Sequence, residues 1–181
     1  MFLISTIKPS YLVGERVFLR EMLIEDAPDV VRWRNNPGIK KWMISQDTLT
    51  VDSHMKWFDS RTEGRVDFMI CDIKTRKSIG TVNYRIIESG VAESGRILGE
   101  KEYHAKGYAS EAARIWLKYG FNYLHFEKIL AKTKSDNIPN INLNIRLGFT
   151  KISEQIQETT QGAIRMVVME LKRDEYENSN S

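Results

Sequence analysis

The sequence predicts an α+β fold in which a mixed, mostly antiparallel central sheet is flanked by helices. A chain of 181 residues with 41% hydrophobic and 28% charged residues has the length and composition of one globular domain. Three strand-like segments follow one another between residues 66 and 99, which favours antiparallel pairing over regular strand–helix alternation. Apolar residues then repeat at helical spacing over residues 107–124. We expect one domain over residues 1–181, with a frayed polar tail at 172–181.

The N-terminal third is predicted to hold one strand and two helices. The strand covers residues 17–22. A helix opens at residues 25–28, where two acidic residues and a proline suit the positive end of a helix dipole. It should end at residues 35–38, which read Asn-Asn-Pro-Gly and break helices. A second short helix is predicted over residues 51–61, where aromatic side chains fall three and four positions apart.

The rest of the chain is predicted to contain a hairpin, a long helix and a second group of strands. Strands at 66–73 and 78–87 are joined by a polar turn, and a third strand at 92–99 precedes the long helix at 107–124. The later elements follow in the order strand, helix, strand, strand, over residues 128–133, 137–147, 149–156 and 163–171. Gly148 stands in the usual C-cap position of the helix before it.

Composition and charge exclude several classes of protein. The formal net charge is +3, which does not supply the dense basic face that nucleic-acid binding requires. No apolar run approaches the ~18 residues of a membrane-spanning helix, and residues 1–10 lack the pattern of a signal peptide. One cysteine, Cys71, permits neither an internal disulfide nor a zinc–thiolate site. We therefore expect a cytoplasmic protein that binds neither nucleic acid nor membrane.

Residues 104–111, which read HAKGYASE, carry the most chemical information. Small residues at Ala105, Gly107 and Ala109 allow a tight turn and a close approach of the backbone to a ligand. The free N–H groups of the following helix then form a cradle for a pyrophosphate, and Lys106 adds a cation. The loop by itself is equally compatible with a small-residue helix start that packs against a sheet.

The loop, the preceding AESGRILG strand and the later NIPNINLNIRLGF segment together resemble the GNAT superfamily of acetyl-CoA-dependent N-acetyltransferases. The family's loop pattern is matched at Gly107 and Ala109, whereas His104 replaces the usual Gln or Arg. The later family signature is matched at Asn137, Gly148 and Phe149. The resemblance implies the GNAT-like three-layer fold, acetyl-CoA as the co-substrate and transfer without a metal or an acyl-enzyme.

The resemblance also implies roles for single residues. It assigns the pantetheine arm to the strand end, through Ile97, Leu98 and Gly99. It assigns the pyrophosphate to the loop, through His104, Ala105, Lys106, Gly107, Tyr108, Ala109 and Ser110. Asn137 matches an asparagine that contacts the pantetheine region. The resemblance also places Asn144 among the cofactor-binding residues. Many members have a tyrosine general acid at this position. Glu93 is the candidate general base, and a solvated strand-end carboxylate is the alternative interpretation.

The acceptor is expected to contact the first 60 residues, where three of the four tryptophans lie. Aromatic rings beside fixed cations suit a flat base, a sugar and phosphates, although the rings could instead bury the two helices against the sheet. The pattern also resembles the nucleotide-aminosugar N-acetyltransferases of the pseudaminic-acid type. On that resemblance Arg34 and His54 match positions that contact the nucleotide, and Thr81 and Asn83 lie on a strand that could face the sugar.

Three functions therefore follow as hypotheses. The first is acetylation of the amino group of a nucleotide-linked amino sugar. The second is acetylation of protein N-termini, as in the ribosomal-protein (Rim) type, whose acceptor needs an open groove that is acidic or neutral. The third is a non-catalytic acetyl-CoA sensor, which the missing tyrosine at Asn144 suggests. The expected partner is a small-molecule amine, and a homodimer is left open.

Overall fold

The computed structural model describes residues 9–61, 63–160 and 162–179. Its strands form one eight-stranded sheet in the order β1-β2-β3-β4-β5-β6-β8-β7. All neighbouring strands are antiparallel except β5 and β6, which are parallel. The strands are β1 (Tyr11–Val13), β2 (Val17–Glu21), β3 (Arg65–Asp72), β4 (Ser78–Glu88), β5 (Val91–Leu98), β6 (Lys128–Lys134), β7 (Thr150–Thr159) and β8 (Gly162–Lys172).

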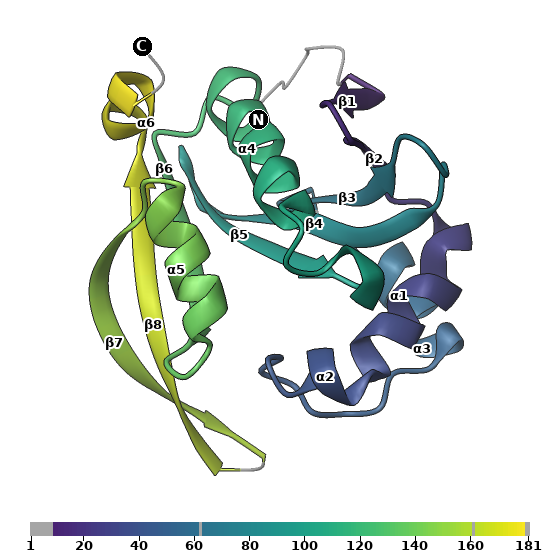
Figure 1. Cartoon of the computed structure of the whole chain (residues 1–181). Helices are drawn as coiled ribbons and strands as arrows, with labels where there is room; N and C mark the ends of the chain where they lie inside the picture. The colour runs from purple at the N-terminus through teal and green to yellow at the C-terminus, as the bar shows by residue number, and fades with distance from the viewer. Residues whose placement is uncertain (1–8, 62, 161, 180–181) are drawn as a thin grey trace.

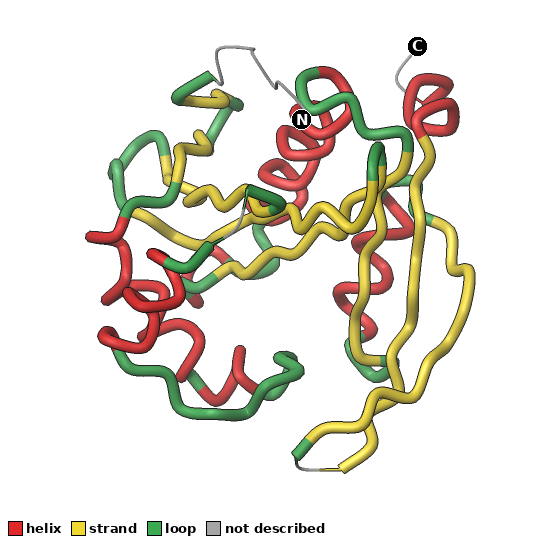
Figure 2. The backbone as a smooth tube through the Cα atoms, turned by 180° about the vertical axis from the view of Figure 1, so that it is seen from behind, coloured by secondary structure: helices red, strands yellow, loops and turns green. Residues whose placement is uncertain are grey.

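Helices cover both faces of this sheet, so the predicted three-layer α+β fold is confirmed (Figures 1 and 2). One face carries α4, α5 and α6, and the other carries α1, α2 and α3. The helices are α1 (Ala27–Asn35), α2 (Pro37–Lys40), α3 (Val51–Asp59), α4 (Tyr108–Asn122), α5 (Ile138–Arg146) and α6 (Arg173–Ser179), with short 3₁₀ turns η1 (Ile24–Asp26) and η2 (Lys101–Tyr103). No helix within the described ranges is both long and apolar enough to cross a lipid bilayer.

Two separate cores hold the layers together. The larger lies between the sheet and α4, where Tyr84 stacks on Trp116 with ring centroids 4.5 Å apart. The Tyr84 hydroxyl also donates to the Trp116 carbonyl oxygen at 2.9 Å, which satisfies a polar group that burial would otherwise penalise. The smaller core lies on the opposite face, where Trp33 of α1 packs against Met69 and Cys71 of β3. Each sheet face therefore presents a rigid surface on which a site can be built.

The parallel pairing of β5 and β6 covers three residue pairs, from Val91–Lys128 to Glu93–Leu130. Beyond these pairs the two strands diverge, with β5 continuing along β4 and β6 continuing along β8 (Figure 1). The backbone of β5 from Ser94 to Leu98 thus keeps its partner strand on one edge and loses it on the other. A polar backbone edge of this kind can pair with an extended ligand.

The predicted elements are all present, with ends that shift by one to three residues. Three departures have physical causes. The short strand β1 was not predicted, because three residues, Tyr-Leu-Val, are too few to show a strand period. Residues 35–38 end α1 as predicted, but Pro37 also begins α2, with Asn36 accepting from the Gly38 N–H as its cap. The expected frayed tail is wrong for residues 172–179, because Lys172 ends β8 and residues 173–179 form α6. Residues 180–181 lie outside the described residues, and so do residues 1–8 of the segment that lacks a signal-peptide pattern.

Candidate active site

The loop before α4 has the backbone shape that the sequence predicts. Gly107 has φ = +86° and Ala105 has φ = +56°, so both adopt the left-handed conformation in which small side chains are tolerated best. Gly107 is the N-cap of α4, and no side chain caps the helix. Within the described residues the N–H groups of Tyr108 and Ala109 have no hydrogen-bond partner. These unpaired donors and the positive helix end can bind an anion.

Arg16 and Glu111 hold this loop in place, and the sequence analysis missed both. One carboxylate oxygen of Glu111 accepts from the backbone N–H groups of Glu15 and Arg16 at 2.9 and 2.8 Å. The other accepts from Arg16 Nε at 2.8 Å, and Arg16 Nη1 donates to the Lys106 carbonyl oxygen at 2.8 Å. Burial tends to raise the pKa of Glu111, but the hydrogen bonds from Arg16, Val17 and Glu15 together outweigh it, so the pKa is lowered. A charged clamp therefore fixes the loop to the start of β2.

The end of β5 is tied to both the loop and α1. His104, predicted as a phosphate contact, instead places Nε2 2.9 Å from the Leu98 carbonyl oxygen. Gly99 lies against the Trp33 ring, whose atoms occupy the space that a Cβ would need. Glu100 accepts a hydrogen bond from Trp33 Nε1 at 2.9 Å and pairs with Arg32. Trp33 is consequently a core residue that joins α1 to the loop, which is the structural alternative weighed for it above.

Arg96, Asn140 and Asn144 meet where β5 and β6 diverge. Arg96 Nη2 donates to Asn140 Oδ1 at 2.5 Å and to Asn144 Oδ1 at 2.6 Å. Asn144 is 1% exposed. A small cavity beside them is lined by Ser94, Leu147 and Phe149 among other residues. Among the described residues no hydrogen bond joins the Asn137 side chain to Arg96 or Asn144; it caps α5 by accepting from the Asn140 N–H at 3.4 Å.

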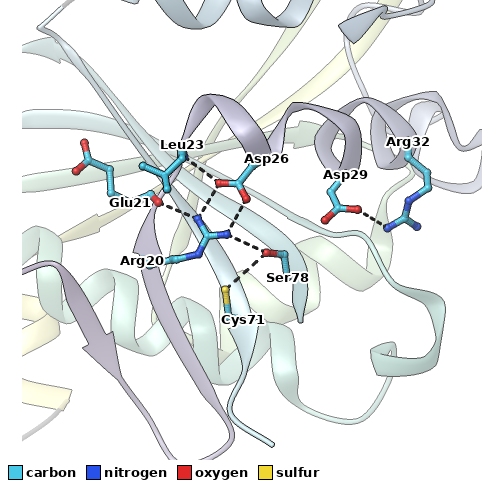
Figure 3. Close-up of polar contacts among 8 residues, drawn as sticks. All are labelled: Arg20, Glu21, Leu23, Asp26, Asp29, Arg32, Cys71 and Ser78. Carbon is cyan, nitrogen blue, oxygen red and sulfur yellow. Dashed lines mark hydrogen bonds and ion pairs between the residues drawn. The ribbon is translucent and has the colours of Figure 1, made fainter. Parts of the chain in front are cut away.

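A partly buried ion pair anchors α1 on the opposite face of the sheet (Figure 3). The Arg20 guanidinium donates to both oxygens of Asp26, at 2.7 and 2.6 Å. Asp26 also accepts from the Leu23 N–H at 2.9 Å, and Arg20 reaches Ser78 Oγ at 3.2 Å. Asp26 stands at the start of α1, so this bidentate contact fixes the helix to β2 and β4.

His54 and Arg34, which the sequence analysis assigns to one nucleotide, lie near enough on this face for the charge of Arg34 to act on His54. His54 is 2% exposed, and its Nε2 has no hydrogen-bond partner among the described residues. Burial, followed by the nearby charge of Arg34, lowers the pKa of His54. Burial and the charge of Arg65 likewise lower the pKa of Arg34. Asp67 lies beside this pair, 4% exposed, and accepts from Arg65 at 3.0 Å.

Aromatic rings and arginine side chains contact one another beside His54, Arg34 and Asp67. His54 and Trp57 have ring centroids 4.9 Å apart, and Arg65 lies 4.9 Å from the centroid of Trp57. Arg61 covers Phe58 at 3.5 Å and approaches Asp67 at 3.4 Å. The predicted combination of aromatic residues with fixed cations is present, and Arg61 and Arg65 supply the cations that contact the rings of Trp57 and Phe58.

Two of the remaining predicted residues lie on the same sheet face. Thr81 and Asn83 of β4 alternate with core residues, which directs them toward α1 and α3. The Asn83 amide lies over Gly95 of β5, where a Cβ would collide with it. Glu93 also lies on β5, but its carboxylate pairs with Arg85 at 3.0 Å and Lys132 at 3.4 Å. No hydrogen bond or ion pair among the described residues joins Glu93 to His54 or Arg34.

Comparison with known proteins gives consistent results. A family model described as an acetyltransferase (GNAT) domain matches residues 16–150. An uncharacterized N-acetyltransferase p20 of Bacillus licheniformis is 34% identical over 147 residues, covering 77% of this chain and 82% of that protein. An N-acetyltransferase 9-like protein of Nematostella vectensis is 27% identical over 158 residues, covering 79% of each chain.

The fold is also found among solved structures. The spermidine N-acetyltransferase of Vibrio cholerae, in complex with CoA and spermine, superposes with a TM-score of 0.83 at 20% sequence identity. The superposition covers 91% of this chain and all of the other. At this identity the likeness establishes the fold alone.

Proposed function

The chain belongs to the GNAT acetyltransferase family and is an acetyl-CoA-dependent acyltransferase, and on that premise we propose that its acceptor is a primary amine carrying an anionic group. The specific acceptor we propose is a nucleotide-linked amino sugar. The amine would be acetylated directly, because close placement of amine and thioester supplies much of the rate in such a reaction. The observation that carries the proposal is the charge of the sheet face beneath α1 and α3.

The acetyl-CoA site that we propose uses the loop before α4 and the free edge of β5. The residues fit an anionic cofactor, since Gly107 has a positive φ and the first N–H groups of α4 lack partners in the described structure. A pyrophosphate there would be stabilised by the helix dipole and by Lys106. The edge of β5 from Ser94 to Ile97, which lacks a partner strand, would hydrogen-bond the extended pantetheine arm, whereas the Leu98 carbonyl oxygen is already in contact with His104. When bound, acetyl-CoA supplies the acetyl group.

Positive charge dominates the proposed acceptor face. In the described part of the chain no carboxylate pairs with Arg34, whereas Asp67 is shared by Arg61 and Arg65. The half-buried Arg34 therefore retains an unneutralised charge beside the open acceptor nitrogen of His54. Phosphates pair well with arginine, and a nucleobase can stack on rings such as Trp57. A polycationic acceptor such as spermine would need free carboxylates, and the carboxylate beside Arg34 and His54, that of Asp67, already pairs with Arg61 and Arg65.

The general base is proposed from two candidates. Glu93 is near the start of the diverging strands, but it would have to release Arg85 or Lys132 before accepting a proton freely. His54 has a bare Nε2, and its lowered pKa keeps the ring neutral at pH 7, which is the form that accepts a proton. Glu93→Gln and His54→Gln should therefore be compared in one pH–rate series, in which loss of the acidic limb identifies the base.

The acceptor class is tested by competition between amines. Initial rates of CoA release should be measured with a UDP-linked amino sugar, the same amino sugar without the nucleotide, spermidine, and a peptide with a free N-terminus. The proposal expects the highest kcat/KM for the nucleotide-linked amine. Higher kcat/KM for spermidine or the peptide would overturn the acceptor proposal. Turnover of any amine would exclude the non-catalytic sensor.

Arg34→Gln makes this test specific to the site. A charge-assisted hydrogen bond is worth ~1.5–3 kcal/mol, so KM for the nucleotide-linked amine should rise roughly tenfold to a hundredfold. KM for acetyl-CoA and for the neutral amino sugar should stay unchanged. Lys56→Gln is the matched control, because Lys56 is an exposed cation on α3. An equal rise in KM for both amines would mean that Arg34 supports the fold and does not bind the nucleotide.

A further inference from the structure

Arg96 is a cation placed in the middle of a sheet strand with no anion beside it. In the described ranges no carboxylate pairs with its guanidinium, which instead donates to two neutral amide oxygens, those of Asn140 and Asn144. The Asn144 amide is oriented from both ends, because its Nδ2 faces Met169 Sδ at 3.8 Å. The amides thus hold the guanidinium in position without neutralising its charge.

This cation lies where the two halves of the sheet separate. Arg96 is three residues beyond Glu93, the last β5 residue paired with β6, and it lines the cavity there with Ser94 and Phe149. Burial lowers the pKa of Arg96 to about 10, so the side chain is still charged at neutral pH. A buried cation held by neutral groups can stabilise a negative charge that forms beside it, because apolar walls strengthen the interaction.

We propose that Arg96 is a catalytic residue that pairs with the sulfur of coenzyme A as it leaves as a thiolate, and that Asn140 and Asn144 are positioning residues for it. This rests on the proposed path of acetyl-CoA along β5. In that proposal the acceptor amine lies on the α1 side of the sheet, and the pantetheine arm of acetyl-CoA lies along the open edge of β5. The amine and the thioester would therefore meet where β5 and β6 diverge.

The reaction step balances without a proton donor at the sulfur. A neutral amine nitrogen bonds to the carbonyl carbon, and the carbon–sulfur bond breaks with its electron pair on sulfur. The proton released from nitrogen passes to the general base proposed above, and the thiolate is left as an anion beside Arg96. Asparagine cannot protonate the thiolate, so an adjacent positive charge replaces the general acid that position 144 lacks.

The proposed contact between Arg96 and the sulfur can be tested by ligand binding alone, without measuring turnover. Affinities for CoA and for desulfo-CoA, which lacks the sulfur, should be measured by calorimetry at about pH 9, where a free thiol of pKa about 8.5 is largely ionised. The intact protein should prefer CoA roughly tenfold to a hundredfold, as expected for one charge-assisted contact. The preference should grow as the pH rises toward the pKa of the free thiol, because the site selects the thiolate.

Arg96→Gln should abolish that preference while leaving the affinity for desulfo-CoA within about threefold. Arg146→Gln, an exposed arginine on the same helix as Asn144, is the matched control and should keep the preference. Equal weakening or equal strengthening of both ligands by Arg96→Gln would overturn the inference, since Arg96 would then hold the arm or block its path. If the intact protein bound neither ligand, the proposed function would fail as well.

Two further variants keep the test decisive if Arg96→Gln does not fold. Arg96→Lys retains the charge and should retain part of the preference for CoA. Asn144→Asp keeps an oxygen for Arg96 but adds a negative charge, so the preference should fall to near unity although the contact persists. A full preference in Asn144→Asp would contradict the proposal, because a neutralised guanidinium would have no charge left to offer the thiolate.

Discussion

Replacing Gly99 with alanine would force a methyl group into the ring of Trp33. The three atoms nearest to the new Cβ all belong to that ring, and all lie well inside the 3.0 Å separation that real Cβ atoms essentially never show. The ring cannot move aside easily, because Trp33 is 1% exposed and its Nε1 is bonded to Glu100. The strain must therefore spread into α1 or into the end of β5.

The expected effect on stability is large. Overpacking of a core typically costs ~1–3 kcal/mol, and the number of ring atoms in collision places Gly99→Ala at about 3 kcal/mol. For a chain of this size, ~2–4 °C are lost per kcal/mol, so the midpoint of thermal unfolding should fall by ~6–12 °C. Gly38→Ala is the control, because the nearest atom to its Cβ is a side-chain oxygen of Asn36 at 3.2 Å. It should change the free energy of unfolding by less than about 1 kcal/mol.

A double-mutant cycle tests the cause of the loss. Urea unfolding should be measured for Gly99→Ala, Trp33→Leu and the double variant. With the ring removed, the added methyl should cost under about 1 kcal/mol, which gives a coupling energy of about 2 kcal/mol. Costs that add to within ~0.5 kcal/mol would refute the reasoning, because independent sites behave in that way.

Two other predictions address the cofactor loop and the acceptor face. Gly107→Glu should abolish acetyl-CoA binding in calorimetry while circular dichroism stays native, since a side chain and a negative charge would fill the anion cradle beside Arg16; unchanged affinity in a folded variant would contradict the assignment. His54→Gln should reduce the loss of stability that occurs between about pH 7 and pH 5. The folded-state pKa of His54 is lowered, so the unfolded chain takes up a proton first as the pH falls through about 6.5. Proton uptake by the unfolded chain then disfavours the folded state. Urea midpoints with the same acid dependence in both proteins would mean that His54 is not the group responsible.

Much of the fold could be predicted because its elements have local patterns. The long helix α4 has apolar residues at helical spacing, and α5 is marked by Asn137 at its start and Gly148 at its end. The polar helix α6 had no such pattern. It is stabilised by a contact remote in sequence, the stacking of Tyr176 on Phe121 with centroids 4.6 Å apart.

The site could be predicted only where its functional residues are neighbours in one segment of the sequence. Gly107 and Ala109 are neighbours in the loop, and their small size already indicates an anion cradle. The clamp between Arg16 and Glu111 joins residues 95 positions apart, and no sequence pattern brings them together. Arg96 offers one clue, a charge inside a strand, but its amide partner Asn144 lies 48 positions away. Contacts of that range follow from the topology of the sheet.

The order of strands in the sheet sets the order in which they can form during synthesis. Strands β1 to β5 pair with their sequence neighbours, so each can join the growing sheet as soon as it leaves the ribosome. The strand β8 is different, because it is made last and yet lies between β6 and β7. Strand β5 pairs only with Lys128, Ile129 and Leu130 of β6, so the rest of β6 has no partner strand until β8 has been made. The nascent chain can therefore hold an ordered N-terminal meander while the second half of β6 is still unpaired, and β7 joins the sheet only through its hairpin with β8.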